Sequence, residues 1–351
     1  MCGWAVFLHY FPREIQCPTH GRAQELIPWA EAYARVSYRL ELLVLTYAQL
    51  MTQKAAAELL HLACSTFSDI LHRAITRLRD GHRVRGLKAI GIDEVSYRKG
   101  QKYVTVVYDL ERACVIWVGQ GKARATIDRF FTEVLSDYQK QRIQWACCDM
   151  SKTYIGAIKE HCPNAQLVLD RFHIAKALNE ALDEVRKQEW RQATGDERKA
   201  LKGLRWLLFR HPSNRSKADT QVLNQLRNSN RRIHRAWVLK DEFNQFWELT
   251  SQTAARGFLA QWSTTALKSR LQPLRELVRT IRKHTDNILT FADSRNSRLT
   301  NATSEGLNRI IGMVKNRASG FRTVQAFIDL IYLTIGDVDL PAKIPAKFRT
   351  L

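Results

Sequence analysis

The feature that most constrains this chain is a change in sequence period between residues 87 and 170. Five stretches there are rich in β-branched, aromatic or other apolar residues and have the length of strands: 89–97, 102–108, 113–118, 143–148 and 165–169. The stretches 125–139 and 151–161 have the apolar spacing of helices. Because only short turns separate the first three strands, we expect an antiparallel meander followed by alternating helices and strands, in the order β-β-β-α-β-α-β-α.

Acidic residues accompany two of the expected strands. We place Asp93 at the end of the first strand and Asp149 at the end of the fourth, and expect these two strands side by side at the centre of the sheet. Two neighbouring carboxylates repel each other unless a cation lies between them. Such a pair suits Mg²⁺ with substrate phosphates and water. Two divalent ions about 3.5–4 Å apart, one activating the attacking oxygen and one the leaving oxygen, serve in-line phosphoryl displacement, so we expect a two-metal site. Taken singly, Asp149 could instead cap the helix at 151–161, and Asp93 could be an exposed acid.

A third acid lies on an expected helix at 302–315. On a helical projection the polar line comprises Asn301, Glu305, Asn308, Gly312 and Lys315. The opposite side carries Leu307, Ile310, Ile311 and Val314. We expect the apolar face to hold this helix on the sheet while the other face presents Glu305 between two amides. The alternative is a simple solvated polar face.

Residues 35–80 have helical spacing interrupted by short turns, with Thr52 as the expected N-cap of a second helix and alanines where two helices must approach. This is the pattern of a helix-turn-helix. Its last helix would place near DNA the side chains of Ser65, Thr66, Ser68 and Arg73. A three-helix cluster without DNA contacts is the plainer alternative.

The charge balance favours a polyanionic partner. Lys and Arg number 55 against 34 Asp and Glu, a formal net charge of +21. Residues 172–299 are helical and basic: from Asp183 to Trp237 there are 14 Lys and Arg against 6 Asp and Glu. Candidate phosphate contacts are Arg231, Arg232 and Arg235. Five tryptophans of this region are interpreted as helix-packing core, with stacking on DNA bases as the alternative: Trp190, Trp206, Trp237, Trp247 and Trp262.

Membrane and secretory readings are disfavoured. No stretch reaches the roughly 20 apolar residues of a spanning helix, and the N-terminus does not have the pattern of a signal peptide. The seven cysteines do not form a disulfide framework, so we expect a reducing, cytoplasmic compartment. Cys17 and His20 have the spacing of half a zinc knuckle, with an ordinary loop as the alternative.

The sequence resembles the DDE transposases of bacterial insertion sequences, specifically the ISL3 family. The resemblance covers roughly residues 35–335 and rests on several motifs in order: Ile92-Asp93-Glu94 through Gly100, Cys148-Asp149-Met150-Ser151, Asp170-Arg171-Phe172-His173, and Asn301-x-x-x-Glu305-Gly306-x-Asn308 with Lys315 and Gly320-Phe321-Arg322. It implies an α/β ribonuclease-H-like core, with a mixed five-stranded sheet and flanking helices, a large all-α insertion and an N-terminal helix-turn-helix.

Asp93, Asp149 and Glu305 match the catalytic triad of this family, which implies Mg²⁺, with Mn²⁺ as a substitute. Asp170, His173, Asn301, Asn308 and Lys315 are candidate auxiliaries. The family usually begins with a cysteine-rich zinc-binding segment, of which Cys17 and His20 match only the second half. The expected domains are 1–34 (zinc-binding-like), 35–82 (helix-turn-helix), 87–180 (first part of the core), 181–299 (basic insertion), 300–335 (final core helices) and 336–351 (tail).

The resulting hypothesis is a transposase associated with the bacterial nucleoid that cuts phosphodiesters at element ends and joins the 3′-hydroxyl to target DNA. Its expected partners are the terminal inverted repeats, target DNA and a second copy of the chain. Two alternatives remain open. One is a ribonuclease-H-like nuclease or resolvase, which would cut without joining. The other is a non-catalytic DNA-binding regulator derived from a transposase.

Overall fold

The computed structural model describes residues 10–25, 27–30, 35–80, 84, 86–98, 100, 102–169, 171–290 and 302–338. The chain forms two compact units. The smaller combines Met1–Arg83 with Ile311–Leu351, and the larger is Val84–Ile310. The six domains expected from the sequence divide the chain more finely than these two units, and they stay a prediction.

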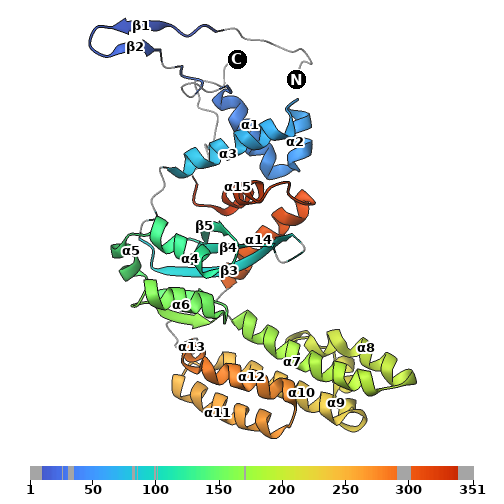
Figure 1. Cartoon of the computed structure of the whole chain (residues 1–351). Helices are drawn as coiled ribbons and strands as arrows, with labels where there is room; N and C mark the ends of the chain where they lie inside the picture. The colour runs from blue at the N-terminus through green and yellow to red at the C-terminus, as the bar shows by residue number, and fades with distance from the viewer. Residues whose placement is uncertain are drawn as a thin grey trace. The chain divides into compact units, whose positions relative to one another are not determined.

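A mixed five-stranded sheet forms the centre of the larger unit (Figure 1). Its strands are β3 (Ala89–Arg98), β4 (Lys102–Asp109), β5 (Cys114–Gln120), β6 (Trp145–Cys148) and β7 (Gln166–Leu169). The spatial order is β5-β4-β3-β6-β7, in which β3, β4 and β5 are antiparallel and β6 pairs parallel with both β3 and β7. The expected meander and the central position of the first and fourth strands are confirmed. This sheet with its flanking helices is compatible with a ribonuclease-H-like core.

The helices between the strands differ from the expectation in one place. The stretch expected as one helix at 125–139 consists of α4 (Arg124–Arg129), a π-helical segment η1 (Phe130–Val134) and α5 (Asp137–Arg142). The single helix was wrong because Ser136 and Gln139 form a capping box, which starts a new helix there. The helix after β6 is α6 (Lys152–His161), close to its expected bounds.

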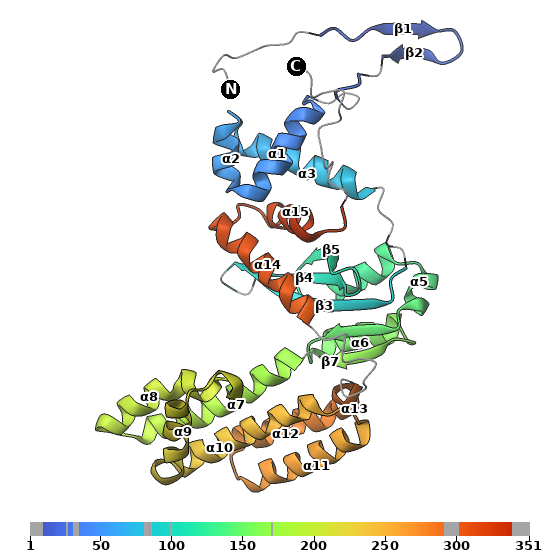
Figure 2. The same ribbon diagram turned by 180° about the vertical axis from the view of Figure 1, so that it is seen from behind.

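The two faces of the sheet are covered by different elements. Ile90 and Ile92 of β3 belong to a core cluster with side chains of α4, η1 and α6. Side chains alternate along a strand, so Gly91 and Asp93 face the opposite way. There the sheet meets the first half of α14 (Ala302–Ala318), which lies beside β3 and β4 (Figure 2). The expected position of Asp93 at the end of this strand was wrong: the strand continues past Asp93 to Arg98, so Asp93 lies in the interior of β3.

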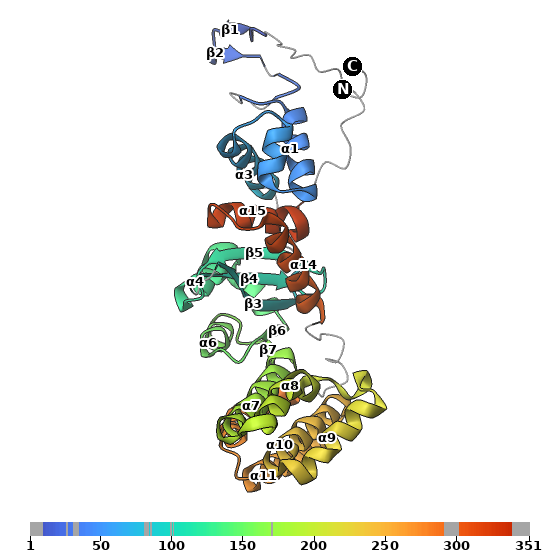
Figure 3. The ribbon, with the colours of Figure 1, turned by 90° about the vertical axis from the view of Figure 1, so that its right-hand side faces the viewer.

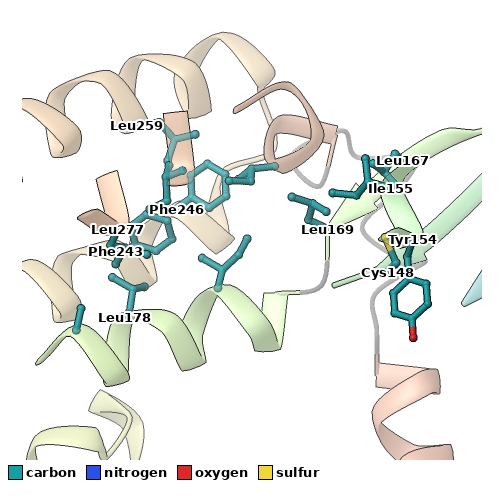
Figure 4. Packing of buried hydrophobic residues seen from close by; sticks show 14 of the residues in the cluster. Cys148, Tyr154, Ile155, Leu167, Leu169, Leu178, Phe243, Phe246, Leu259 and Leu277 are labelled. Atoms are coloured by element: carbon teal, nitrogen blue, oxygen red, sulfur yellow. The ribbon is translucent and has the colours of Figure 1, made fainter. Parts of the chain in front are cut away.

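Between β7 and α14, the described residues form a region of helices joined by short turns (Figure 3). Its elements are α7 (Arg171–Gln192), α8 (Gly195–Phe209), a 3₁₀ turn (Pro212–Asn214), α9 (Lys217–Ser229), α10 (Arg231–Glu242), a second 3₁₀ segment (Phe243–Glu248), α11 (Gln252–Lys268), α12 (Gln272–Lys283) and α13 (Thr285–Leu289). Its apolar side chains join those of the sheet in one cluster, shown in part in Figure 4.

The tryptophans of this region divide into two groups. Trp237 and Trp262 are buried, and Trp190 and Trp247 are partly buried against the cluster, as the packing interpretation expects. Trp206 differs, because 70% of it is exposed.

The smaller unit contains α1 (Tyr38–Leu50), α2 (Gln53–Leu59), α3 (Cys64–Asp80) and α15 (Val324–Ile335), with a hairpin of β1 (Glu14–Cys17) and β2 (Gly21–Gln24). Thr52 caps α2 as expected, its side chain accepting a hydrogen bond from the Ala55 amide. Ala56 and Ala57 are fully buried, consistent with a close approach of helices. Of the helices in the described ranges, none is long and apolar enough to cross a membrane.

Candidate active site

Strand register brings Asp93 and Asp149 to one face of the sheet. Gly91 of β3 pairs with Cys147 of β6 in the parallel ladder. Each aspartate comes two residues after one member of this pair, so both side chains project toward the face that α14 covers. The pairing of neighbours thus places two carboxylates together, as the sequence predicted.

The Asp93 carboxylate is held by two nitrogen donors. The backbone amide of Glu94 donates to Oδ1 at 2.7 Å, and the side-chain amide of Asn308 donates to Oδ2 at 2.5 Å. The Tyr108 hydroxyl in turn donates to Oδ1 of Asn308 at 2.5 Å. Since an amide oxygen only accepts and an amide nitrogen only donates, Tyr108 fixes the orientation in which Asn308 reaches Asp93.

Asp149 has a local contact of its own. Its Oδ1 accepts a hydrogen bond from the Ser151 amide at 2.9 Å, in the turn that leads into α6. The N-cap residue of α6 is Ser151, so the alternative that Asp149 caps this helix is wrong. The carboxylate supports the turn, and its negative charge also acts on Asp93.

The carboxyl of Asp93 lies in an electrostatically unfavourable place. Burial raises the pKa of the Asp93 carboxyl above its ordinary value. The Glu94 amide, the charge of His173 and the Asn308 amide oppose this shift, whereas the negative charge of Asp149 adds to it. A carboxyl whose pKa remains raised despite several favourable partners lies in a place that a cation would stabilise.

Glu94 faces the other side of the sheet and makes a separate set of contacts. Tyr154 of α6 donates a hydrogen bond to its Oε1 at 3.1 Å, and Lys122 lies 3.8 Å from its Oε2. Burial raises the pKa of Glu94, and the charges of Asp149 and Asp93 contribute in the same direction. The adjacent acids of the Asp93-Glu94 motif therefore have different surroundings.

The remaining candidate residues differ in how near they lie to Asp93. Nε2 of His173, in the first turn of α7, lies 4.0 Å from Oδ1 of Asp93, so His173 is at the site. Glu305 is exposed in the first turn of α14, three residues before Asn308 and therefore on a neighbouring part of the same helical face. In the described ranges, no three His, Cys, Asp or Glu side chains cluster closely enough to hold a metal.

Lys315 belongs to the smaller unit. Asp170 and Asn301 lie outside the described residues.

The other predicted positions lie on helices or in the hairpin. Ser65, Thr66 and Arg73 are exposed on α3, whereas the hydroxyl of Ser68 donates to the Cys64 carbonyl of the preceding turn. Cys17 and His20 are adjacent in the β1–β2 hairpin, with Sγ and Nδ1 3.4 Å apart.

The three arginines of α10 are all exposed, but two of them have partners within the protein. Arg232 pairs with Glu189 at 3.2 Å, and Arg235 donates to the Ser269 carbonyl at 3.0 Å. These two make structural contacts between helices, which sequence alone does not show.

Two residues of the site escaped the sequence analysis. Tyr108 was interpreted only as a strand residue, although it orients Asn308. Gly91 was not singled out, yet a Cβ atom at this position would come within 2.7 Å of the Ser304 hydroxyl oxygen and 2.8 Å of Leu110 Cδ2. A glycine inside an apolar strand was the available signal, because it often marks a close approach of another element.

Known proteins resemble this chain over most of its length. Residues 90–331 match the model of the DDE transposases of the ISL3 type, a family described as transposases. The transposase for insertion sequence element IS1001 of Bordetella parapertussis is 30% identical over 331 residues, covering 92% of this chain and 80% of that protein. The transposase for insertion sequence element IS1557 of Mycobacterium tuberculosis strain H37Rv is 28% identical over 355 residues, covering 94% and 79%.

Among solved structures, the Drosophila P element transposase strand transfer complex aligns with 89% of this chain and 95% of that chain, at 12% identity and a TM-score of 0.40. The family model covers well over half of the chain, and the Bordetella relative spans nearly all of it. The chain therefore belongs to the ISL3 family of DDE transposases of insertion sequences.

Proposed function

We propose that Asp93, Asp149 and Glu305 form the catalytic triad of this transposase. The observation that carries the proposal is the pairing of Asp93 and Asp149 on one sheet face, with the Asn308 amide of α14 on Asp93. Glu305 lies about one helical turn from Asn308. The helix that contacts Asp93 through Asn308 therefore also carries the third acid of the proposed triad.

The donor set fits a hard divalent cation such as Mg²⁺, with Mn²⁺ as a substitute. Carboxylate oxygens are the ligands that Mg²⁺ prefers beside substrate phosphates. Burial raises the pKa of Asp93, and a cation beside it would favour the charged carboxylate. When bound there, the ion would activate the attacking oxygen and stabilise charge on the transferring phosphate. Asp93 and Asp149 would hold it from the sheet, and Glu305 would hold it from α14.

The reaction we infer is hydrolysis of a phosphodiester at an element end, followed by attack of the freed 3′-hydroxyl on target DNA. In this reaction the protein positions the groups and stabilises charge. Asn308, fixed by Tyr108, holds the Asp93 carboxylate in one orientation. His173, 4.0 Å from Asp93, is placed to donate a hydrogen bond to a phosphate oxygen at the edge of the site.

For DNA recognition we infer a helix-turn-helix formed by α2 and α3. Ser65, Thr66 and Arg73 are exposed at the beginning and middle of α3, while Phe67, Ile70 and Leu71 on the same helix are fully buried. A helix with one packed face and one exposed polar face can enter the major groove. Because two DNA ends must be joined, we expect the active form to be a homodimer on DNA.

The test is a cleavage and strand-transfer reaction with labelled element-end DNA and Mg²⁺. The wild-type protein should nick the end and then join it to target DNA. Asp149→Asn and Asp93→Ala should lose both steps while their affinity for the end stays within about threefold, since the changes remove charge and not the fold. Asp128→Asn is the matched control, because Asp128 is a partly exposed acid paired with Arg124 and His161.

The outcomes separate the alternatives. Cutting without joining would favour a nuclease or resolvase, and salt-sensitive binding without cutting would favour a regulator. Mg²⁺-dependent cleavage that survives in Asp93→Ala would contradict the assignment of the triad.

A further inference from the structure

A groove between α7 and α8, in the helical region of the larger unit, is lined only by tryptophans and cationic side chains. Its volume is about 490 Å³. The lining residues are Arg186, Lys187, Trp190, Arg191, Lys202, Arg205 and Trp206. Grooves of this size hold small organic groups, and the lining decides which chemistry is accepted.

Trp206 is the side chain of this groove whose position is not explained by packing in the protein core. It is 70% exposed although it lies on a regular helix, whereas Trp237 and Trp262 of the same region are buried. Exposed aromatic side chains that gather at a groove mark binding surfaces more often than single exposed residues do. The indole of Trp206 is supported from the side by Phe209, at an interplanar angle of 86° and a centroid distance of 6.1 Å.

The two tryptophan rings of the groove already contact guanidinium groups, one from Arg198 outside the lining and one from Arg205 within it. Arg198 lies over the ring of Trp190 at 4.1 Å, and Arg205 lies over Trp206 at 5.1 Å. These contacts show that the rings present π surfaces to flat, delocalised groups. A nucleobase is also a flat π system, and it would stack on the same kind of surface.

The charge of the groove exceeds what the neighbouring acids neutralise. Asp183 is shared by three cations, with Arg186 at 2.7 Å, Lys187 at 3.2 Å and Arg205 at 3.7 Å. Glu184 is shared by Lys187 and Arg191. Five cations against two acids leave a positive excess, which suits the phosphates on either side of a bound base.

The geometry points to an unpaired DNA nucleotide as the occupant of this groove, with its base stacked on Trp206 and its flanking phosphates held by Lys202 and Arg205. This inference rests on the proposed function, since it assigns a second contact of the same enzyme to the same DNA. A fully paired duplex hides the faces of its bases, so the groove would select a strand that is locally unpaired.

Helix α7 connects the groove to the candidate active site. His173 lies near its start and Arg186 lies 13 residues later, which at 1.5 Å per residue corresponds to about 20 Å along the helix. That length matches about six nucleotide steps of a DNA strand. An unpaired nucleotide in the groove would therefore lie within reach of a strand that also occupies the active site.

The experiment compares a fully paired duplex with the same duplex carrying a short unpaired segment that contains 2-aminopurine. Fluorescence anisotropy gives the affinity, and 2-aminopurine emission reports stacking directly. We expect the wild-type protein to bind the unpaired DNA at least about fivefold more tightly and to quench its emission. Trp206→Ala should lose both effects and retain its affinity for the paired duplex, whereas Trp206→Phe should retain part of both. Lys202→Ala should reduce the salt dependence of binding to the unpaired DNA.

Tyr138→Ala is the matched control, because Tyr138 is 66% exposed and carries Arg142 near its ring, as Trp206 carries Arg205, but lies outside the groove. An unchanged preference for unpaired DNA in Trp206→Ala would overturn the groove assignment while leaving the transposase proposal intact. Failure of the wild-type protein to bind either DNA would overturn both. Loss of self-association without loss of DNA preference would identify the groove as a contact between copies.

Discussion

Asn308 can reach Asp93 in only one of its two amide orientations, and Tyr108 selects that orientation. The phenol donates to the amide oxygen, which leaves the amide nitrogen to face the carboxylate. Burial raises the pKa of Tyr108 well above its ordinary value, so the phenol stays protonated and remains a donor across the working range of pH. A fully buried residue thereby controls the position of one that we place at the reaction.

We predict that Tyr108→Phe slows end cleavage about tenfold with little loss of DNA affinity. Without the phenol, Asn308 samples both amide orientations and Asp93 loses its fixed partner, while the fold loses one hydrogen bond, about 1 kcal/mol. Single-turnover cleavage and urea unfolding measure the two effects. Tyr154→Phe removes a comparable hydroxyl from Thr105 and Glu94. Equal losses of rate in the two variants, each matching its loss of stability, would show a purely structural role for Tyr108.

A second prediction concerns Gly91 of β3. The Cβ of Gly91→Ala would lie 2.7 Å from the Ser304 hydroxyl and 2.8 Å from Leu110, so α14 must shift away from β3 or the side chains must move. We expect a loss of stability of about 1–3 kcal/mol, typical of overpacking, together with strongly reduced cleavage. Chemical denaturation measures the first effect. Gly203→Ala is the control, because Gly203 is helical and has open space around it. A fully active and stable Gly91→Ala would contradict the proposed close approach.

At the scale of elements, the end of α8 depends on a lysine from α10. Nζ of Lys240 donates to the carbonyls of Leu208 and Phe209 at 3.3 Å and of Arg210 at 3.5 Å. These carbonyls belong to the last turn of α8, where helical partners are missing. Burial, followed by the nearby charge of Arg215, lowers the pKa of Lys240 to about 8.

The sign of the resulting pH effect follows from proton binding. Between pH 8 and the ordinary lysine value of 10.5, the unfolded chain binds more protons at Lys240 than the folded chain does, so folding becomes more favourable as pH rises. We predict that the stability of the wild type relative to Lys240→Met increases by on the order of 2 kcal/mol from about pH 7 to about pH 9.5. Urea unfolding at both values measures this difference. Lys217→Met, at an exposed lysine, should show none, and a pH-independent difference for Lys240→Met would refute the lowered pKa.

The sequence predicted strands better than it predicted where helices break. The first three strands were readable because β-branched residues and short turns coincide there, and the last two because short apolar stretches alternate with helical spacing. Pairing neighbours then placed Asp93 beside Asp149. The break inside 125–139 was missed because apolar spacing continues through it to Tyr138, which the fold leaves exposed. The Ser136-x-x-Gln139 pattern carried the missing information as a capping box. The orientation of Asn308 could not be predicted, since it depends on a tyrosine 200 residues earlier.

At the scale of the whole molecule, the smaller unit joins segments from both ends of the sequence. Helix α15 packs on α1 and α3. His72 of α3 lies 3.1 Å from buried Asp329, and the guanidinium of Arg79 lies 3.5 Å from the centre of the Tyr332 ring. Arg317 donates to the carbonyls at the end of α1. No local pattern could reveal this, because every one of these contacts spans more than two hundred residues.

This arrangement predicts that the N-terminal helices do not fold alone. A fragment of residues 35–83 exposes the side chains that α15 covers, and three short helices bury too little apolar surface to offset their ordering. We expect weak helical circular dichroism and no cooperative melting for this fragment. The same fragment joined through a Gly/Ser linker to residues 311–338 should melt cooperatively, and Phe327→Ala, at a fully buried position of α15, should destabilise it by about 3–5 kcal/mol. Cooperative folding of 35–83 by itself would show instead that α15 is only attached to an independent helix-turn-helix.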